Sequence, residues 1–378
     1  MSIIYLLLVF LAFYVLQNII YEKHWNRNLK VEAEFKNTEI FEGESTEIIE
    51  TLKNNKWLPV WWINMQIPIS RYLIFTEEEE LKPRPKESSR KDFYTLLSYE
   101  KVTQNIKITA LRRGYYKIDE FSIGSGDLFS QSRFLQQLKG NTSLCVYPRI
   151  IDTPMLNIFL NKLSGEVLTK RHIIEDPFTF RGIRDYTVYD SLKLVNWNAT
   201  ARTGDMKVNQ YDYTISQETM IILNTERFNQ WDNDVLLEES IRLAASISAD
   251  FIKNGVQVGI KANSLELSAA QEVDFKPRSG SAQLYLILDV LAKLQSDKIT
   301  RDIKDILEQE KSKIKRAYNI VFISYYYDEG LYEKFSELKD GGVSIQWIVP
   351  ALKGEKVKLQ SDNKIFIWEV SEDERRIF

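Results

Sequence analysis

The sequence predicts a multidomain protein with an N-terminal transmembrane helix, an antiparallel β-sandwich and then an α/β domain. Three observations lead to this fold class: an uncharged apolar run at the N-terminus, short strand-like segments without helical periodicity in the next third, and alternating strands and helices in the last part. One hydrophobic core rarely serves more than about 250 to 300 residues, and this chain has 378. We therefore expect an anchor with a basic flank over 1–27, a β-sandwich over 28–150, a joint over 151–215 and an α/β domain over 216–378.

Residues 2–21 contain no charged side chain and, as a helix, would be about 30 Å long, which is the thickness of a bilayer's hydrocarbon core. No basic residue precedes the run and no small-residue cleavage site follows it, so we expect a retained span and not a cleaved signal peptide. Lys23, Arg27 and Lys30 follow it. Positive charge marks the cytoplasmic side, so the prediction is a single-pass protein of the cell membrane with its large C-terminal portion in the cytoplasm.

The β-sandwich prediction rests on alternation between apolar and polar residues. Residues 29–35 alternate, and further strand-like runs cover 40–52, 60–69, 93–99, 102–111 and 115–123, separated by turn residues such as Asn54-Asn55 and Arg113-Gly114. Residues 77–91 carry acidic and then basic charges with two prolines, which predicts an exposed loop. Together these segments predict an antiparallel sandwich of immunoglobulin-like type.

After residue 216 the hydrophobic pattern changes from strand-like segments alone to alternating strands and helices. A buried strand at 219–223, a long amphipathic helix at 234–253 that ends at Asn254-Gly255, and a strand at 256–262 form one βαβ unit. Helices are expected at 281–294, 302–315 and 331–339, strands at 318–324, 343–349 and 364–370, and a possible hairpin edge at 265–275. Such alternation predicts a mostly parallel sheet with helices on both faces.

Composition excludes several classes of function. The net charge is −3, with 50 basic and 53 acidic residues, so nothing favours a nucleic-acid partner. The only cysteine, Cys145, lies in an apolar run and is interpreted as a small buried side chain. The chain has two histidines, no phosphate-binding loop and no dinucleotide fingerprint. We expect no cofactor and no enzyme activity.

The joint holds an unusual mixture of charged and aromatic residues between 175 and 211. It contains Arg181, Arg184, Arg202, Asp176, Asp185, Asp190, Asp205, Phe178, Phe180, Tyr186, Tyr189 and Trp197. Charges among large aromatics must be paired when they are partly desolvated. Three interpretations remain open: ion pairs with Trp197 wedged between two domains, a protein-recognition patch around Arg184 and Arg202, or a catalytic carboxylate at Asp185 or Asp190.

These motifs resemble the domain of unknown function 58 family. The resemblance is carried by Gly182-Ile183-Arg184-Asp185-Tyr186, Asp190-Ser191, Asn196-Trp197 and Ala201-Arg202-Thr203-Gly204, preceded by Arg112-Arg113-Gly114-Tyr115-Tyr116, Gly126-Asp127-Leu128-Phe129 and Val146-Tyr147-Pro148-Arg149. The family usually has glycine where this chain has Tyr189. The signature residues are thus Gly182, Arg184, Asp185, Tyr186, Asp190, Trp197 and Arg202, with a binding or structural role.

The resemblance implies a membrane-tethered protein whose C-terminal domain is von Willebrand factor A-like, often associated with MoxR-type AAA+ ATPases. Domains of that type hold a divalent metal through Asp-x-Ser-x-Ser after their first strand. Here the matching positions are Asn224, Glu226 and Phe228, and Phe228 has no ligand atom. We expect the metal site to be lost, with Asn224, Glu226, Asp232 or Asp234 left as an atypical alternative.

The leading hypothesis is a membrane-anchored, non-enzymatic interaction or scaffold protein that works with a MoxR-type AAA+ ATPase in assembling or maturing envelope complexes. One alternative is an extracytoplasmic adhesion or cell-wall-binding protein, which requires the opposite orientation. Another is a hydrolase with an unrecognised carboxylate site near Asp185 and Asp190.

Overall fold

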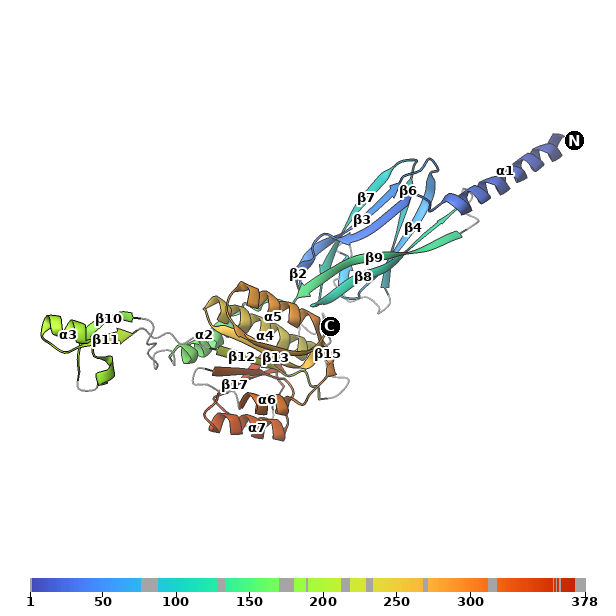
Figure 1. Cartoon of the computed structure of the whole chain (residues 1–378). Coiled ribbons are helices and arrows are strands. Elements are labelled where there is room, and N and C mark those ends of the chain that lie inside the picture. Colours follow the sequence, from blue (N-terminus) through green and yellow to red (C-terminus); the bar gives the residue numbers. More distant parts are fainter. Residues whose placement is uncertain are drawn as a thin grey trace. The chain divides into compact units, whose positions relative to one another are not determined.

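A computed structural model describes residues 2–75, 88–127, 133–169, 180–187, 190–211, 218–228, 234–267, 271–311, 318–355, 357, 359 and 362–370. The chain divides into two compact units. The first is Met1–Arg149 with Leu291–Lys293, and the second is Ile150–Val290 with Leu294–Ser371. Figure 1 shows the elements of both units, and each unit has its own hydrophobic core.

The first unit begins with α1 (Ser2–His24), which confirms the predicted apolar helix. Among the described residues it is the one helix long and apolar enough to cross a membrane. Most of its large side chains are exposed along the whole first half, for example Ile3 at 76% and Leu6 at 72%. Leucine, isoleucine and phenylalanine exposed on every side of a helix fit a lipid environment and not water.

The last turns of α1 pack on the rest of the unit. Gln17, Tyr21 and Trp25 are spaced four residues apart, lie on one face of the helix and are all buried. Gln17 Nε2 donates to Asp127 at 3.0 Å, the Tyr21 hydroxyl donates to the carbonyl of Pro59 at 3.2 Å, and the Trp25 ring stacks on Phe134. The helix is therefore joined to the domain by specific contacts and not by a loose linker.

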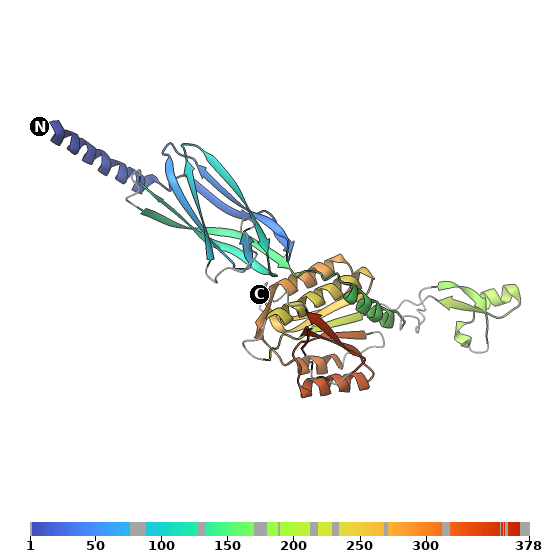
Figure 2. The same ribbon diagram turned by 180° about the vertical axis from the view of Figure 1, so that it is seen from behind.

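The domain that follows is a sandwich of two sheets (Figure 2). The first sheet has the order β1 (Leu29–Phe35), β3 (Ser45–Asn54), β7 (Lys101–Ala110), β5 (Leu73–Phe75). The second has the order β2 (Glu39–Phe41), β9 (Arg133–Tyr147), β8 (Gly114–Gly126), β4 (Val60–Ile69), β6 (Ser88–Leu96). All pairs except β2 with β9 are antiparallel, which confirms the predicted β-sandwich.

Alternating burial along the strands builds the core between the sheets. On β3 every second residue from Thr46 to Asn54 is buried, and Leu52 meets Ile63 of the opposite sheet in one apolar cluster. The period of two places one face of each strand inside. The same rule buries Glu50, a carboxylic acid, at 0% exposure.

Two sequence predictions for this domain need correction. Residues 88–91 were expected in the exposed loop of 77–91, but they begin β6 and pair with β4 from Ile69↔Ser88 onward. The rest of that loop, 77–87, lies outside the described residues. The strand β9 is also longer than the apolar run around Cys145, because its first half has one exposed face and its polar residues hide the alternation.

The second unit contains a mixed seven-stranded sheet. Its order is β14 (Glu272–Arg278), β13 (Gln257–Glu266), β12 (Glu218–Leu223), β16 (Tyr318–Ile323), β17 (Ser344–Leu352), β18 (Ile365–Val370), and β15 (Leu294–Ile299) pairs with β13. The helices are α2 (Pro154–Thr169), α4 (Asp234–Lys253), α5 (Ser281–Lys293), α6 (Ile303–Lys311) and α7 (Glu329–Asp340). The strands from β13 to β18 run parallel, while β14 and β15 are antiparallel edges.

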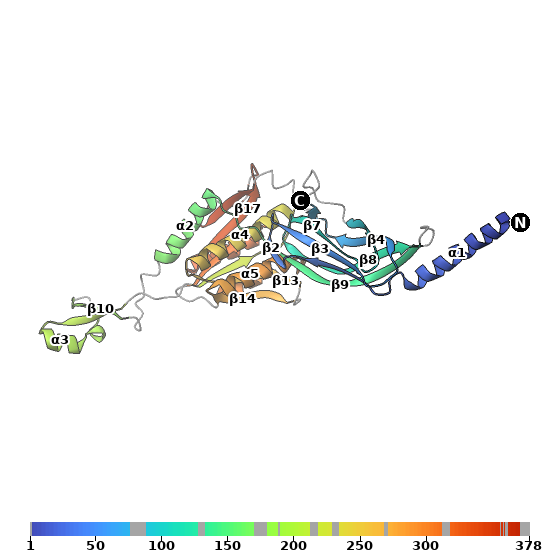
Figure 3. The same cartoon turned by 90° about the horizontal axis from the view of Figure 1, so that it is seen from above.

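Helices cover both faces of this sheet, as the alternating pattern predicts (Figures 1 and 3). Met220, Ile222 and Phe322 belong to one cluster with Leu307 of α6 and Phe335 of α7. The strand residues between them, such as Ile221, point to the opposite face, where α4 packs. Because both faces are covered, β12 and β16 are continuous apolar runs.

Candidate functional site

The signature segment folds into a small module of its own within the second unit. It consists of β10 (Phe180–Asp185), the 3-10 turn η2 (Leu192–Leu194), α3 (Trp197–Thr203) and β11 (Lys207–Tyr211), with β10 and β11 antiparallel. We call these residues the signature module. Local sequence accounts for α3: Asn196 caps its first turn by accepting from Ala199 N at 2.9 Å, and Gly204 ends it in the left-handed conformation.

The signature arginine and aspartate form a two-pronged ion pair. Arg184 donates from both terminal nitrogens to Asp190, at 2.6 and 2.5 Å. Asp190 also accepts from the backbone N–H and the hydroxyl of Thr187, each at 2.8 Å. The hydrogen bonds from Arg184, and then those from Thr187, hold the pKa of Asp190 well below its usual range. We call this ion pair the Arg184–Asp190 clasp. It stabilises the turn that follows β10, which is a structural role.

The second signature acid is also paired. Lys207 of β11 bonds to Asp185 of β10, and this hydrogen bond raises the pKa of Lys207. A catalytic carboxylate would be expected free in an open pocket. Asp185 and Asp190 each face a cation instead, so their geometry gives no support to the hydrolase alternative.

The module has a minimal core and exposes several large apolar side chains. Val195 and Val208 are buried against each other through an isolated bridge. In contrast, Trp197 is 66% exposed, and Ile183, Leu192 and Met206 are exposed as well. The Trp197 ring is thus exposed on the module, and the interpretation of Trp197 as a wedge between two domains stays a prediction.

The remaining described signature residues are Arg202, Tyr186 and Gly182. Arg202 is exposed near the end of α3 and forms no ion pair with any residue the structure describes. Tyr186 is half-buried and its N–H donates to the carbonyl of Met206. Gly182 sits at a register shift in β10, where a side chain would meet nothing within 4 Å. Tyr189 lies outside the described residues.

A second candidate site lies at the carboxyl ends of β12 and β16. The chain leaves β12 toward β13 on one side and leaves β16 toward β17 on the other, and such switch points are where open α/β sheets bind ligands. Asn224 lies there at 0% exposure. Its amide donates to Ser324 Oγ at 3.0 Å, and its oxygen accepts from Asn263 Nδ2 at 2.8 Å and from Glu226 N at 3.1 Å.

This network leaves little for a metal. Asn263 in turn accepts from Thr225, and Phe228 contacts the rings of Tyr325, Tyr326 and Tyr327. Burial, and then Asp302, raise the pKa of Glu226. Arg227 pairs with Asp234 at 2.8 Å, and Asp232 lies outside the described residues. In the described part of the chain no three His, Cys, Asp or Glu side chains gather as a metal site would require.

The sequence suggested Asn224 but missed its partners Asn263 and Ser324. Ser324 follows β16, and Asn263 lies in β13 directly after Ala262, the last residue that pairs with β12; carboxyl ends of such parallel strands share one edge of the sheet. Polar residues at the ends of the three central strands were therefore a usable signal.

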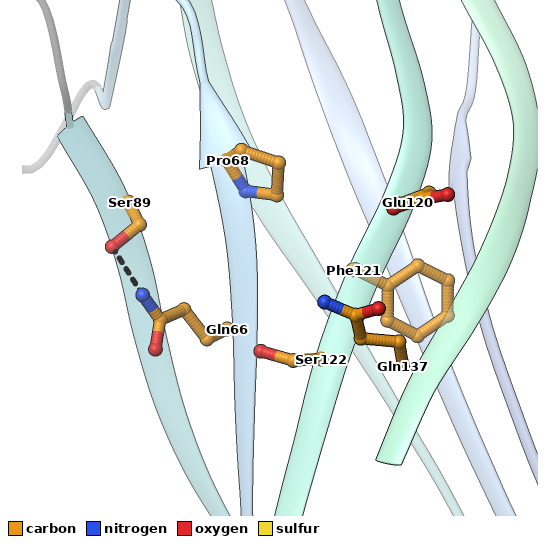
Figure 4. A pocket seen from close by; sticks show the side chains of 7 residues that line it. All are labelled: Gln66, Pro68, Ser89, Glu120, Phe121, Ser122 and Gln137. Carbon is orange, nitrogen blue, oxygen red and sulfur yellow. Dashed lines mark hydrogen bonds between the residues drawn. The ribbon is translucent and has the colours of Figure 1, made fainter. Parts of the chain in front are cut away.

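Two pockets lie elsewhere in the described part of the chain. A shallow one of about 250 Å³ on the outer face of the sandwich is lined by Gln66, Pro68, Ser89, Glu120, Phe121, Ser122 and Gln137 (Figure 4). Gln66 donates to Ser89 across it at 2.9 Å. A second of about 180 Å³ lies beside α2, between Ile158, Gln346 and Phe366.

Comparison with known proteins identifies the class. A family model described as "Protein of unknown function DUF58" matches residues 182–345, from the signature module through the central strands of the sheet. This match supports the resemblance drawn from the motifs of the chain. A search of curated proteins finds no match.

Solved structures similar to parts of the chain include small β domains. One is the CARDB domain of a Pyrococcus furiosus protein in complex with di-metal ions, at 11% identity, 31% of this chain, 93% of that chain and a TM-score of 0.20. A second is a PapD-like domain of human CEP192, at 12% identity, 32% of this chain, 87% of that chain and a TM-score of 0.20. A third is BslA, a bacterial hydrophobin, at 13% identity, 33% of this chain, 97% of that chain and a TM-score of 0.19.

Proposed function

We propose that this chain is a membrane-anchored, non-enzymatic interaction protein that binds a partner protein through its signature module. One observation carries the proposal: the module holds Trp197 two-thirds exposed on a fixed helix end. An exposed tryptophan costs free energy in water, and tryptophan is among the residues most enriched at the centre of protein interfaces.

The surroundings of Trp197 support the same proposal. Ile183, Leu192 and Met206 add exposed apolar surface to a module of few residues, and Arg202 adds a cation. Aromatic, methionine and arginine side chains are the types that interfaces favour over the remaining surface. The Arg184–Asp190 clasp and the Asn196 cap fix the backbone in advance, which lowers the entropy cost of binding.

The class of partner rests on the family resemblance. In this proposal the partner is a MoxR-type AAA+ ATPase, the second unit is von Willebrand factor A-like, and the complex serves assembly or maturation of envelope complexes. Lys23 in the last turn of α1, with Arg27 and Lys30 after the helix, supports a cytoplasmic location of both units, where such an ATPase would be found.

A pull-down of the full-length chain from detergent extract tests the interaction. Trp197→Ala and Arg202→Ala should each reduce capture of an AAA+ ATPase identified by mass. Tyr285→Ala is the matched control, because Tyr285 on α5 is also an exposed aromatic at 56% but lies outside the module. Capture that survives both module changes, or that falls equally with Tyr285→Ala, would contradict the proposal.

Orientation is tested separately by protease treatment of intact cells. The cytoplasmic placement predicts that both units survive until the membrane is permeabilised. Digestion from outside would favour the adhesion alternative instead.

A further inference from the structure

The end of the sandwich from which α1 leaves carries a group of exposed apolar side chains. Trp57 is 66% exposed, Trp61 44%, Leu97 54% and Tyr99 71%. We call these four residues the aromatic rim. They belong to the β3–β4 and β6–β7 connections and to the start of β4.

Strand register places the rim beside α1. Leu29, the first residue of β1, pairs with Asn54 at the end of β3, and Val60 at the start of β4 pairs with Leu96 at the end of β6. The connections 55–59 and 97–100 are tied together by the Ser98 hydroxyl donating to the carbonyl of Trp57. Lys56, next to Trp57, donates to the carbonyl of Trp25 at the end of α1 at 2.8 Å.

The length of α1 leads to a mismatch. Gln17, Tyr21 and Trp25 are held by the sandwich, so the part of the helix ahead of these contacts covers residues 3–16, about 21 Å at about 1.5 Å per residue. A hydrocarbon core is about 30 Å thick. About 9 Å of the apolar layer must therefore be met by something other than this part of the helix.

From these observations we infer that the aromatic rim is seated in the membrane interface, so that the α1 end of the sandwich dips into the bilayer that holds α1. This rests on the membrane anchoring proposed above. Amphipathic tryptophan and tyrosine rings prefer the depth of the lipid headgroups, and interfacial elements enter by about 5 to 10 Å, which matches the missing length.

The backbone at Tyr99 agrees with a role beyond local folding. Tyr99 has φ of +61°, in the left-handed region that glycine and asparagine prefer. A bulky residue there costs on the order of 1 kcal/mol, so the turn itself would be served better by glycine. An exposed aromatic ring kept in a strained turn is explained by what the ring contacts outside the protein.

Charge at the same end suits lipid headgroups. Lys30, Lys53 and Lys101 are neighbours across β1, β3 and β7, near the same end of the sheet. Lys30 is paired with Glu32, and Lys53 and Lys101 are exposed opposite each other. Like charges directly opposite destabilise a sheet, and anionic phosphates would relieve that repulsion.

Nitroxide labels on the full-length chain in liposomes test the inference, in a background where Cys145→Ser removes the one native thiol. Labels go at Leu97→Cys in the rim, at Leu8→Cys on α1 and at Ser45→Cys, an exposed position at the opposite end of β3. Collision with a water-soluble nickel chelate is measured. We expect the Leu97 and Leu8 labels to be several-fold less accessible than the Ser45 label.

The outcomes separate the two proposals. A protected Leu8 label with a Leu97 label as accessible as Ser45 would overturn the rim inference and leave the anchoring intact. An accessible Leu8 label would overturn both. In a further arm, Trp57→Ala with Tyr99→Gly should raise accessibility at Leu97; glycine suits the backbone at Tyr99, so lost protection cannot be ascribed to a broken turn. No change in this arm would also contradict the rim's role.

Discussion

The buried acid Glu50 gives the sharpest stability prediction. It lies at 0% exposure on β3, its Oε2 accepts from the Tyr94 hydroxyl at 2.5 Å, and its Oε1 is buried without a hydrogen-bond partner. Burial, with a smaller contribution from Asp92, raises the pKa of Glu50 to about 7 against the opposing effects of Tyr94 and Arg90. The protonated acid is therefore the form that the folded sandwich prefers.

The direction of the pH effect on stability follows from the difference between the folded and unfolded pKa of Glu50. A carboxyl whose folded pKa is raised contributes its stability below the unfolded pKa, 4.5, and loses it as the pH rises through about 7. At about 1.36 kcal/mol per pKa unit, ionisation of Glu50 removes about 3 kcal/mol by pH 8. Glu50→Gln cannot ionise, so its free energy of unfolding relative to the native chain should rise by about 2.5 kcal/mol between pH 5 and pH 8.

Hydrogen exchange on full-length protein in detergent measures this change, read from peptides of β3 and β7 at each pH. The comparison of variant with native chain at one pH cancels the intrinsic exchange rate. Glu34→Gln, an exposed glutamate on β1, is the control and should give a flat difference. If the Glu50→Gln difference is equally flat from pH 5 to pH 8, the assignment of a buried, protonated acid is refuted.

Three further predictions concern other parts of the chain. Asn196→Ala removes the cap of α3 and should cost about 1 kcal/mol, seen as faster amide exchange in α3 with α4 unchanged. Lys261→Met leaves Glu310, at 0% exposure, without its cation; a loss of about 3 to 5 kcal/mol in denaturant unfolding is expected, and adding Glu310→Gln should restore part of it. Gly140→Ala would place a methyl 2.1 Å from a backbone oxygen of β8 and should lower the melting temperature clearly, whereas Gly182→Ala, with nothing within 4 Å, should not.

Much of the second unit could be predicted because local signals agree with its fold. The helix expected at 234–253 is α4 with the same bounds, since its apolar face repeats regularly and Gly255 adopts φ of +77° after it. The buried strands β12 and β16 were equally plain as apolar runs between turn signals.

Other features depend on contacts that sequence does not encode locally. The edge strand β15 was not expected, because its residues gain a strand partner only through the distant β13. The sequence left open whether Trp197 contacts another part of the chain or a partner protein, since a tryptophan's identity does not say whether its partner is internal or external. The clasp of Arg184 and Asp190 was within reach, because opposite charges close in sequence flank a turn.

The hydrogen-bond network around Asn224 has a consequence for anyone who would engineer this domain to take up magnesium. Replacing Asn224 by aspartate supplies an anionic oxygen that can still accept from Asn263, but it deletes the amide that donates to Ser324 and buries a negative charge in its place. Phe228 would still fill the space with carbon. For this edge of the sheet to bind an ion, several side chains must therefore be replaced together. Each substitution alone would lower the stability of the domain before a bound ion could compensate.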